Sequence, residues 1–383
     1  MALVKDYAFA TGGIIWKIID RTRFESKSLT YKVSLVIGLA LVCWIPLAAV
    51  SFIQLGWEQF YLLFIRDIAT HVRIILVLPI LIFARQSLNN EFNKMISIFH
   101  ETKIVDHDNA EGFQKVMDWL MKWRNSRVVD VLLILLVYSS FFVHESGIIN
   151  KSGSYVPWLL YENKITAAGW WYFLFSLPIT QLLLYRWLYT IFLWIIFLRK
   201  ISRLDLHLSS LHPDGMGGLG FLNYTQRSYF PVAFAFSCLA AGGLNNMIIF
   251  SETSIVDYKL LIGSLLIFVL LLFILPLFVF VPRLYVVKRK YFLTYSMQAW
   301  LFARKYEAEL KEFYNTEENK PDSSWHVDLI GSFEKTSSMN IVIIQKTTLV
   351  AFVVAVIVPF LAVVAQEAPL KDIFVTLFSK FLG

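Results

Sequence analysis

Long apolar stretches constrain the fold of this chain more than any other feature of its sequence. A helix needs about 20 largely apolar residues to cross the hydrocarbon core, because every backbone polar group must be bonded within the segment. Seven such stretches are present: roughly 34–56, 60–84, 128–146, 169–198, 229–250, 259–282 and 347–366. They predict an all-α, polytopic transmembrane helical bundle of about seven spans, within a range of six to eight.

The composition supports the same class. Hydrophobic residues make up 57% and charged residues 16% of the 383 positions, against about 25% charged in soluble chains. These figures exclude a soluble enzyme, a secreted disulfide scaffold and a disordered chain. The two cysteines, Cys43 and Cys238, both lie in apolar runs. We therefore expect packed thiols, with neither a disulfide framework nor a cysteine metal site.

Lysine and arginine residues in the connections orient the chain, because cytoplasmic loops carry an excess of both. Six, seven, four and ten of them lie in four alternate connections: 1–33, 85–127, 199–228 and 283–346. The connections on the other side hold very few. We therefore expect a cytoplasmic N-terminus and an outer C-terminus, with the net charge of +7 next to anionic lipid.

The spans and connections together predict how the chain is organised. Within the last long connection, residues 297–313 have the pattern of a helix, which 317–324 interrupts. The predicted segments are a cytoplasmic amphipathic segment (1–33), two spans (34–84), a cytoplasmic segment (85–127), two spans (128–198), a Gly-rich cytoplasmic loop (199–228), two spans (229–282), a basic cytoplasmic helical segment (283–346), and the last span with a C-terminal amphipathic tail (347–383).

The most distinctive string is HPDGMGGLGFL, from His212 to Leu222. Its glycines allow positive φ angles and successive exposed N–H groups, which is how anion-binding nests form. No Gly-Lys-Ser/Thr follows, so it is not a nucleotide-hydrolase phosphate loop. The readings are a tight turn, a ligand-sensing or gating loop, and a metal site with no established ligand spacing. The candidate ligand or gating residues are Arg203, His212, Asp214, Gly215, Gly217, Gly218, Gly220 and Arg227.

This string resembles the HPDxxGGLGFL signature of a widespread family of uncharacterised bacterial inner-membrane proteins. The resemblance extends to 67–82 (DIATHVRIILVLPILI) and to 123–126 (WRNS), so it covers most of the chain. The chain departs from the family pattern at Asn125, where the family has Asp. The resemblance implies a multi-pass protein of the bacterial inner membrane, and it implies no particular activity.

Ionisable residues interrupt the second predicted span. Arg73 lies eleven residues, about 17 Å, from the cytoplasmic end at Ala84, which places it near the bilayer midplane. Asp67 and His71 are four residues apart, so the carboxylate can orient and charge the imidazole. An ionisable group in a membrane is a functional candidate by default. Three readings remain open: a packing network, a pore-lining or proton-carrying cluster, and residues at the outer interface.

Other polar residues in the spans are less specific. Asn245 and Asn246 end a run of small residues in the fifth span, where amides either bond across a helix interface or line a pore. Arg186 lies near the inner end of the fourth span, where its side chain is expected to reach the headgroups.

No constellation of residues predicts an enzyme. The sequence contains no His-Glu-x-x-His, no Gly-x-Ser-x-Gly and no pair of carboxylates at one depth. We expect no cofactor and no metal. The first hypothesis is a homo-oligomeric channel or pore, with Asp67, His71, Arg73, Asn245 and Asn246 on the ion pathway.

An anionic cytoplasmic ligand, a nucleotide or oligonucleotide, would gate such a channel, as in a bacterial defence effector. The expected partners are the lipid bilayer, further copies of the chain and this ligand, with no duplex nucleic acid. The two alternatives are a proton-coupled secondary transporter, which the lack of an internal repeat weakens, and a membrane scaffold or signalling protein without transport.

Overall fold

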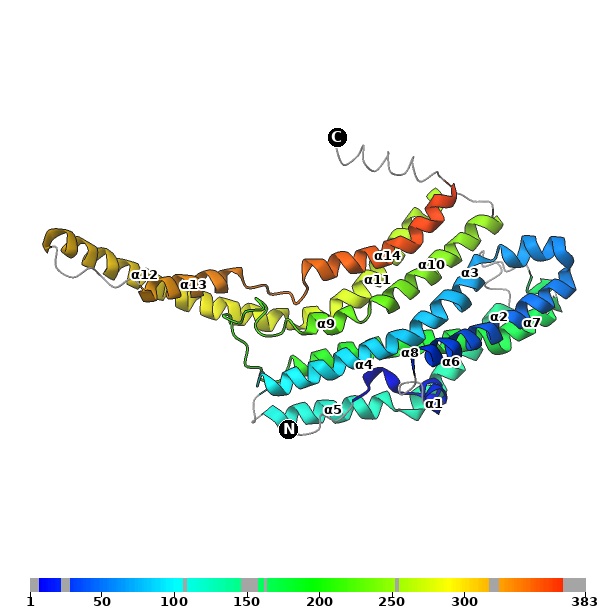
Figure 1. Ribbon diagram of the computed structural model, residues 1–383, viewed down its shortest axis with the longest axis horizontal. Coiled ribbons are helices and arrows are strands. Elements are labelled where there is room, and N and C mark those ends of the chain that lie inside the picture. The colour runs from blue at the N-terminus through cyan, green and yellow to red at the C-terminus, as the bar shows by residue number, and fades with distance from the viewer. Residues whose placement is uncertain are drawn as a thin grey trace.

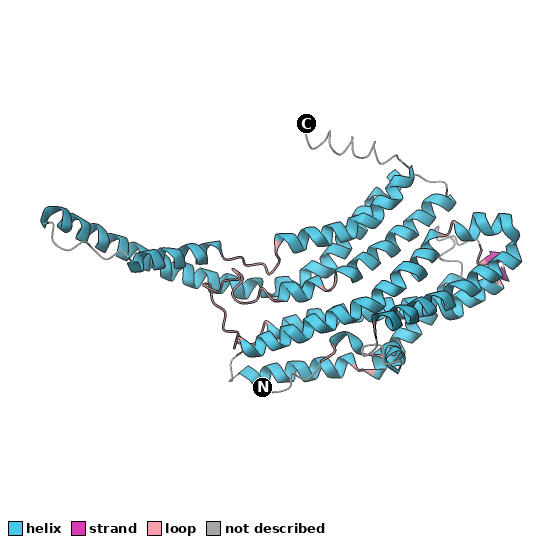
Figure 2. Ribbon diagram, viewed as in Figure 1, coloured by secondary structure: helices cyan, strands magenta, loops and turns pink. Residues whose placement is uncertain are grey.

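The computed structural model describes residues 7–21, 28–105, 109–145, 158–161, 164–251, 255–316 and 324–367. These residues are almost entirely helical (Figure 2), apart from a minimal hairpin in which Leu160 pairs with Ile165. The predicted all-α class is therefore confirmed. The predicted C-terminal amphipathic tail, 371–383, lies outside the described residues.

The elements of the first part of the chain are η1 (Phe9–Thr11), α1 (Ile14–Arg21), α2 (Leu29–Gln59), η3 (Phe60–Ile65), α3 (Ile68–His71), η4 (Val72–Val77), α4 (Leu78–Glu101), α5 (Ala110–Arg124), α6 (Arg127–Glu145), β1 (Leu160–Tyr161) and β2 (Lys164–Ile165). Those of the second part are α7 (Ala167–Trp171), η7 (Tyr172–Ser176), α8 (Leu177–Ile201), α9 (Leu222–Arg227), α10 (Phe230–Ser251), η8 (Ile255–Tyr258), α11 (Lys259–Ile274), η9 (Leu275–Phe280), α12 (Val281–Thr316), α13 (Ser324–Ser338) and α14 (Lys346–Glu367). Of the short elements, η3, η4 and η7 are π-helical, and η1, η8 and η9 are 3₁₀-helical.

Six helices among the described residues are long and apolar enough to cross a membrane: Leu29–Ile65, Ile68–Glu101, Ala167–Ile201, Leu222–Phe250, Lys259–Lys311 and Lys346–Ala365. In addition, α6 covers the third predicted stretch. The chain is thus a multi-pass membrane protein, with a number of spans inside the predicted range.

The spanning helices lie side by side in a bundle, and α12 with α13 forms an arm that projects from one end of it (Figure 1). We call that end the arm end and the opposite end, where β1 and β2 lie, the hairpin end. The predicted helix 297–313 lies within α12. In the arm, α12 and α13 pack against each other, so the last predicted basic segment is a helical pair.

Helix α10 occupies the middle of the bundle, packed against α14 on one side and against α3, η4 and α4 on another. Small residues permit this close approach. A Cβ atom at Gly242 would lie 3.3 Å from the Cα atom of Ala69, which is tighter than most such contacts. Glycine at 242 therefore sets the distance between α10 and α3.

The predicted second span, 60–84, is wrong at both ends. Gly56 adopts a φ of 71° and bends the first long helix. Beyond this bend the helix continues through η3 to Ile65, so residues 60–65 belong to the first span and not to the second. Asp67 then caps the next helix, which runs for 34 residues from Ile68 to Glu101. Hydropathy alone detects neither the glycine bend nor the cap, because both depend on backbone geometry.

Candidate functional site

Asp67 is the centre of a polar cluster at the hairpin end. It is the N-cap of α3, and its side chain is 0% exposed. Its Oδ1 accepts hydrogen bonds from the Thr70 N–H at 3.0 Å and from Asn246 Nδ2 at 2.7 Å, and its Oδ2 accepts one from Trp158 Nε1 at 2.7 Å. Bonds of this kind to an ionised acceptor are short and strong. The carboxylate is therefore held by three separate segments of the chain.

Both polar atoms of the Asn246 side chain form hydrogen bonds in this cluster. Its Nδ2 donates to Asp67, and its Oδ1 accepts from the Ala69 N–H at 3.2 Å. One side chain of α10 thus bonds both a backbone N–H group in the first turn of α3 and the carboxylate that caps this helix. Among the described residues, neither amide atom of the neighbouring Asn245 has a hydrogen-bond partner, so the two adjacent asparagines have different surroundings.

His71 is held as a neutral imidazole. Trp44 Nε1 donates to its Nδ1 at 3.0 Å, and its Nε2 lies 3.0 Å from the carbonyl oxygen of Phe64. An indole only donates and a carbonyl only accepts, so these partners assign the proton to Nε2. The prediction that Asp67 orients and charges this imidazole is not met, because Trp44 and Phe64 occupy both ring nitrogens.

Arg73 donates to the hydroxyl group of Tyr172, and its guanidinium carbon lies 5.9 Å from the centre of that ring. It is five residues, about 8 Å, from the start of α3 at Ile68. Arg73 therefore lies nearer to the start of its helix than the predicted span 60–84 implies, because the helix starts at Ile68 and continues past Ala84 to Glu101. The Asp67 cluster lies near one end of the bundle.

Two members of this cluster were missed by sequence reasoning. The side chain of Tyr172 is buried beside Trp158, with ring centroids 5.5 Å apart. Trp158 lies in a connection, where nothing in the sequence marks it as a ligand of Asp67. Trp158 and Asp67 are 91 residues apart, so no sequence signal pairs them.

The glycine-rich loop at the arm end folds around its own aspartate. The Oδ1 of Asp214 accepts from the Met216 N–H at 2.8 Å and from the Gly218 N–H at 3.1 Å, and its Oδ2 accepts from the Gly220 N–H at 2.8 Å. His212 Nδ1 lies 2.9 Å from Asp214 Oδ1. The predicted anion-binding nest is thus formed, but the carboxylate of Asp214 fills it, so these N–H groups are not open to another anion.

The electrostatics of Asp214 follow from this geometry. Burial, the largest effect, raises the pKa of its carboxyl group. The backbone hydrogen bonds from Met216, Gly220 and Gly218, together with the bond to His212, outweigh burial and lower that pKa below its ordinary value. The carboxylate form is thus the one that the loop stabilises.

The loop also joins the arm to the bundle. Gly215 has a φ of 64°, and its carbonyl accepts from the Asn340 N–H at 2.8 Å. Gly217 has a φ of 71°, and a Cβ atom there would lie 2.8 Å from Leu284 Cδ2 and 3.1 Å from Met339 Cε. The glycines therefore serve close packing against the start of α12 and the end of α13.

The two arginines assigned to the loop serve different contacts. Arg227 donates from Nε to Thr348 Oγ1 at 2.8 Å and from Nη2 to Thr347 Oγ1 at 2.9 Å, which ties α9 to the first turn of α14. Arg203 is exposed, and its carbonyl oxygen lies 3.4 Å from Arg283 Nη2. Arg203 is the more exposed of the two, whereas Arg227 is half-buried.

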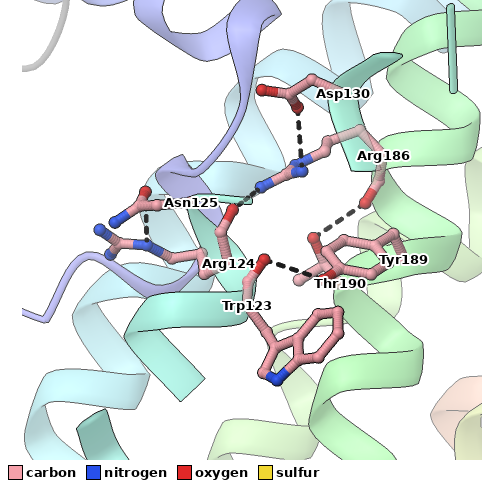
Figure 3. Close-up of polar contacts among 7 residues, drawn as sticks. All are labelled: Trp123, Arg124, Asn125, Asp130, Arg186, Tyr189 and Thr190. Atoms are coloured by element: carbon pink, nitrogen blue, oxygen red, sulfur yellow. Dashed lines mark hydrogen bonds and ion pairs between the residues drawn. The ribbon is translucent and has the colours of Figure 1, made fainter. Parts of the chain in front are cut away.

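A third cluster lies between the bundle and the N-terminal segment (Figure 3). Arg186 is 3% exposed, with Nη1 3.4 Å from Asp130 Oδ1 and Nη2 donating to the carbonyl of Arg124. The expectation that Arg186 reaches the headgroups is therefore wrong, because α6 supplies a buried carboxylate. Gly12 and Gly13 pack directly against this pair, where any Cβ atom would collide.

Arg124 lies at the C-terminal end of α5. Its Nη1 donates to the carbonyls of Tyr7 and Ala8 at 2.6 and 2.8 Å, and so holds the N-terminal segment on the bundle. Its Nε donates to Asn125 Oδ1 at 3.3 Å (Figure 3). A carboxylate would accept the same bond, so the asparagine keeps the contact without the charge.

The metal site left open by the sequence gains no support. Among the described residues, no group of three or more His, Cys, Asp and Glu side chains converges closely enough to hold a metal ion.

The two asparagines of α10 give a matched test of the Asp67 cluster. We expect Asn246→Ala to lower the free energy of unfolding by about 1.5–3 kcal/mol, because it removes a hydrogen bond to a charged group and leaves the Ala69 N–H unbonded. Asn245→Ala, which removes an unpaired amide, should leave stability unchanged or raise it. Thermal unfolding in detergent measures both; equal losses would contradict the assignment.

The loop predicts a pH dependence. The lowered pKa of Asp214 means that the carboxylate adds stability above its ordinary pKa of about 3.9, and that this stability is lost as pH falls through the lower folded value. Asp214→Asn should therefore be less stable than the wild type at pH 7 by about 1.5–3 kcal/mol. The difference should shrink below about pH 4. Thermal unfolding midpoints measure it, with the exposed Asp205→Asn as control; a difference independent of pH would refute it.

Comparison with protein-family models, with curated proteins and with solved structures found no match to this chain. Any function assigned to it therefore rests on its own residues and their geometry.

Proposed function

We propose that this multi-pass membrane protein is a signalling or scaffold protein, which couples its membrane-spanning bundle to the position of its arm. The observation that carries the proposal is one helical path, Lys259–Lys311, that runs from the bundle into the arm. Along it, η9 (Leu275–Phe280) is 3₁₀-helical between two α-helices. A 3₁₀ stretch within a helix often marks a functional hinge.

The contacts around η9 support its role as a hinge. Pro276 lacks an N–H group, so the helical hydrogen-bond pattern is interrupted there. The buried side chain of Gln226 donates from Nε2 to the carbonyl of Phe273, and its Oε1 accepts from Trp194 Nε1 at 3.1 Å. A side chain held by α8 thus bonds the backbone just before the hinge.

The internal hydrogen bonding of the polar clusters also favours this proposal over transport. Asp67, His71 and Asn246 have their polar atoms bonded within the chain. Groups paired in this way stabilise the packing of helices. Because they are not turned toward water, they do not by themselves form an ion pathway.

We place the arm in the cytoplasm of a bacterial inner membrane. The four connections rich in lysine and arginine, 1–33, 85–127, 199–228 and 283–346, support this orientation through the positive-inside rule. The resemblance of the HPDGMGGLGFL string supports the bacterial assignment.

The test is a distance measurement between spin labels at Lys305→Cys on the arm and Lys115→Cys on α5, both exposed positions, in lipid nanodiscs. We expect more than one arm position, and a changed distribution in Gln226→Leu, because the Phe273 carbonyl loses its partner. The matched control is Gln114→Leu, whose amide bonds only at the surface to Asp118. A single narrow distance distribution that is identical in the labelled parent protein, Gln226→Leu and Gln114→Leu would refute the coupling.

A homo-oligomeric channel is the second candidate. What favours it is the position of Asp67 and Arg73 beside three π-helical segments, η3, η4 and η7, since such segments are frequent at functional sites. An anionic cytoplasmic ligand such as a nucleotide would gate it through Arg203, after displacing Asp214 from its nest.

Purified protein in a planar bilayer tests the channel. Unitary currents should appear, and Arg73→Ala should change their size, whereas the control Arg66→Ala, an exposed arginine at the same end, should not. Light scattering should give an assembly of several copies. A monomer that stays silent at all voltages, with and without added nucleotides, excludes this candidate.

A further inference from the structure

A cavity of about 250 Å³ lies between α3–η4, α10 and α14. We call it the α10 groove; it includes Ile68, Val72, Phe234, Asn245, Val358 and Val363. Its volume is about eight times the ~30 Å³ that a water molecule occupies in the liquid. All of its lining residues are apolar except Asn245, so the site suits a hydrocarbon rather than a hydrated ion.

The shape of the groove follows α10. Phe234 and Asn245 both line it, and eleven residues of helix separate them by about 17 Å. Ala241 and Gly242, which have little or no side chain, lie between these two positions on the wall. A long, narrow, apolar space parallel to the helices of a bundle fits a single extended hydrocarbon chain.

Asn245 supplies the polar end of the groove. It is 1% exposed, and neither its Nδ2 nor its Oδ1 has a hydrogen-bond partner in the part of the chain that the structure describes. A buried amide without partners is costly, and in a native structure it calls for an explanation such as a bound ligand. The complementary group must accept from Nδ2 and donate to Oδ1.

We propose that the α10 groove binds a single-chain lipid with a protic end group, a fatty acid or fatty alcohol, whose carboxyl or hydroxyl group is bonded by Asn245. The chain lies along α10 toward Phe234. An ester carbonyl only accepts, so the acyl chain of an intact phospholipid would leave Oδ1 unpaired. The inference does not depend on the proposed function, because it rests on the groove and the amide alone.

The test is photo-crosslinking of the purified full chain in detergent with a diazirine-bearing palmitic acid, followed by mapping of the labelled peptides. We expect saturable labelling of α10 and α14. Free palmitic acid should compete at least about tenfold better than its methyl ester, the value of roughly one hydrogen bond. Equal competition by acid and ester, or labelling confined to other helices, would overturn the proposal.

Two variants separate the polar contact from the space. Asn245→Leu should weaken binding of the acid about tenfold and abolish the preference over the ester. Ala362→Trp should block labelling by filling the groove from α14, whereas Ala49→Trp, equally exposed but on α2, should not. Undiminished labelling of the folded Ala362→Trp protein would also overturn the proposal, and the unfolding midpoint confirms that each variant is folded.

Discussion

A carboxylate without access to water must be surrounded by donors, and Asp67 shows how strongly that requirement shapes this protein. An uncompensated charge in a membrane bundle is expensive, so the backbone of α3, the indole of Trp158 and the amide of Asn246 are all directed at one side chain. These donors come from three distant parts of the sequence. The hydrogen bonds to this one carboxylate therefore fix where α3 starts. They also fix how α10 and the segment that carries Trp158 are placed along α3.

The same physics operates at the other polar clusters. Arg186 and Asp130 form a largely buried pair, and Arg186 also bonds to Arg124, which holds the N-terminal segment. In the glycine loop, the carboxylate of Asp214 accepts hydrogen bonds from the backbone N–H groups around it. Charged groups that stand out in the sequence thus serve architecture in the structure. The 3₁₀ segment η9, the arm beyond it and the unpaired amide of Asn245 belong to none of these clusters.

The sequence predicted the class of fold, the helix within the arm and most of the helices that are apolar enough to span a membrane, because hydropathy and helical periodicity report directly on burial in lipid. It failed where an outcome depends on a partner far along the chain. Asn245 and Asn246 are identical in any one-dimensional pattern, yet one is fully bonded and the other has no partner. The depth of Arg73 depended on a glycine bend and a helix cap that hydropathy does not register.

The 3₁₀ segment at the base of the arm has a mechanical consequence. Helix α12 has 36 residues, a rigid rod of about 54 Å. A tilt of roughly 10° at its base would carry the far end through about 9 Å, given that length. A small rearrangement of helix packing in the bundle would thus move the tip of the arm by about the width of a helix. Such a rearrangement would be too small to open a passage through the bilayer.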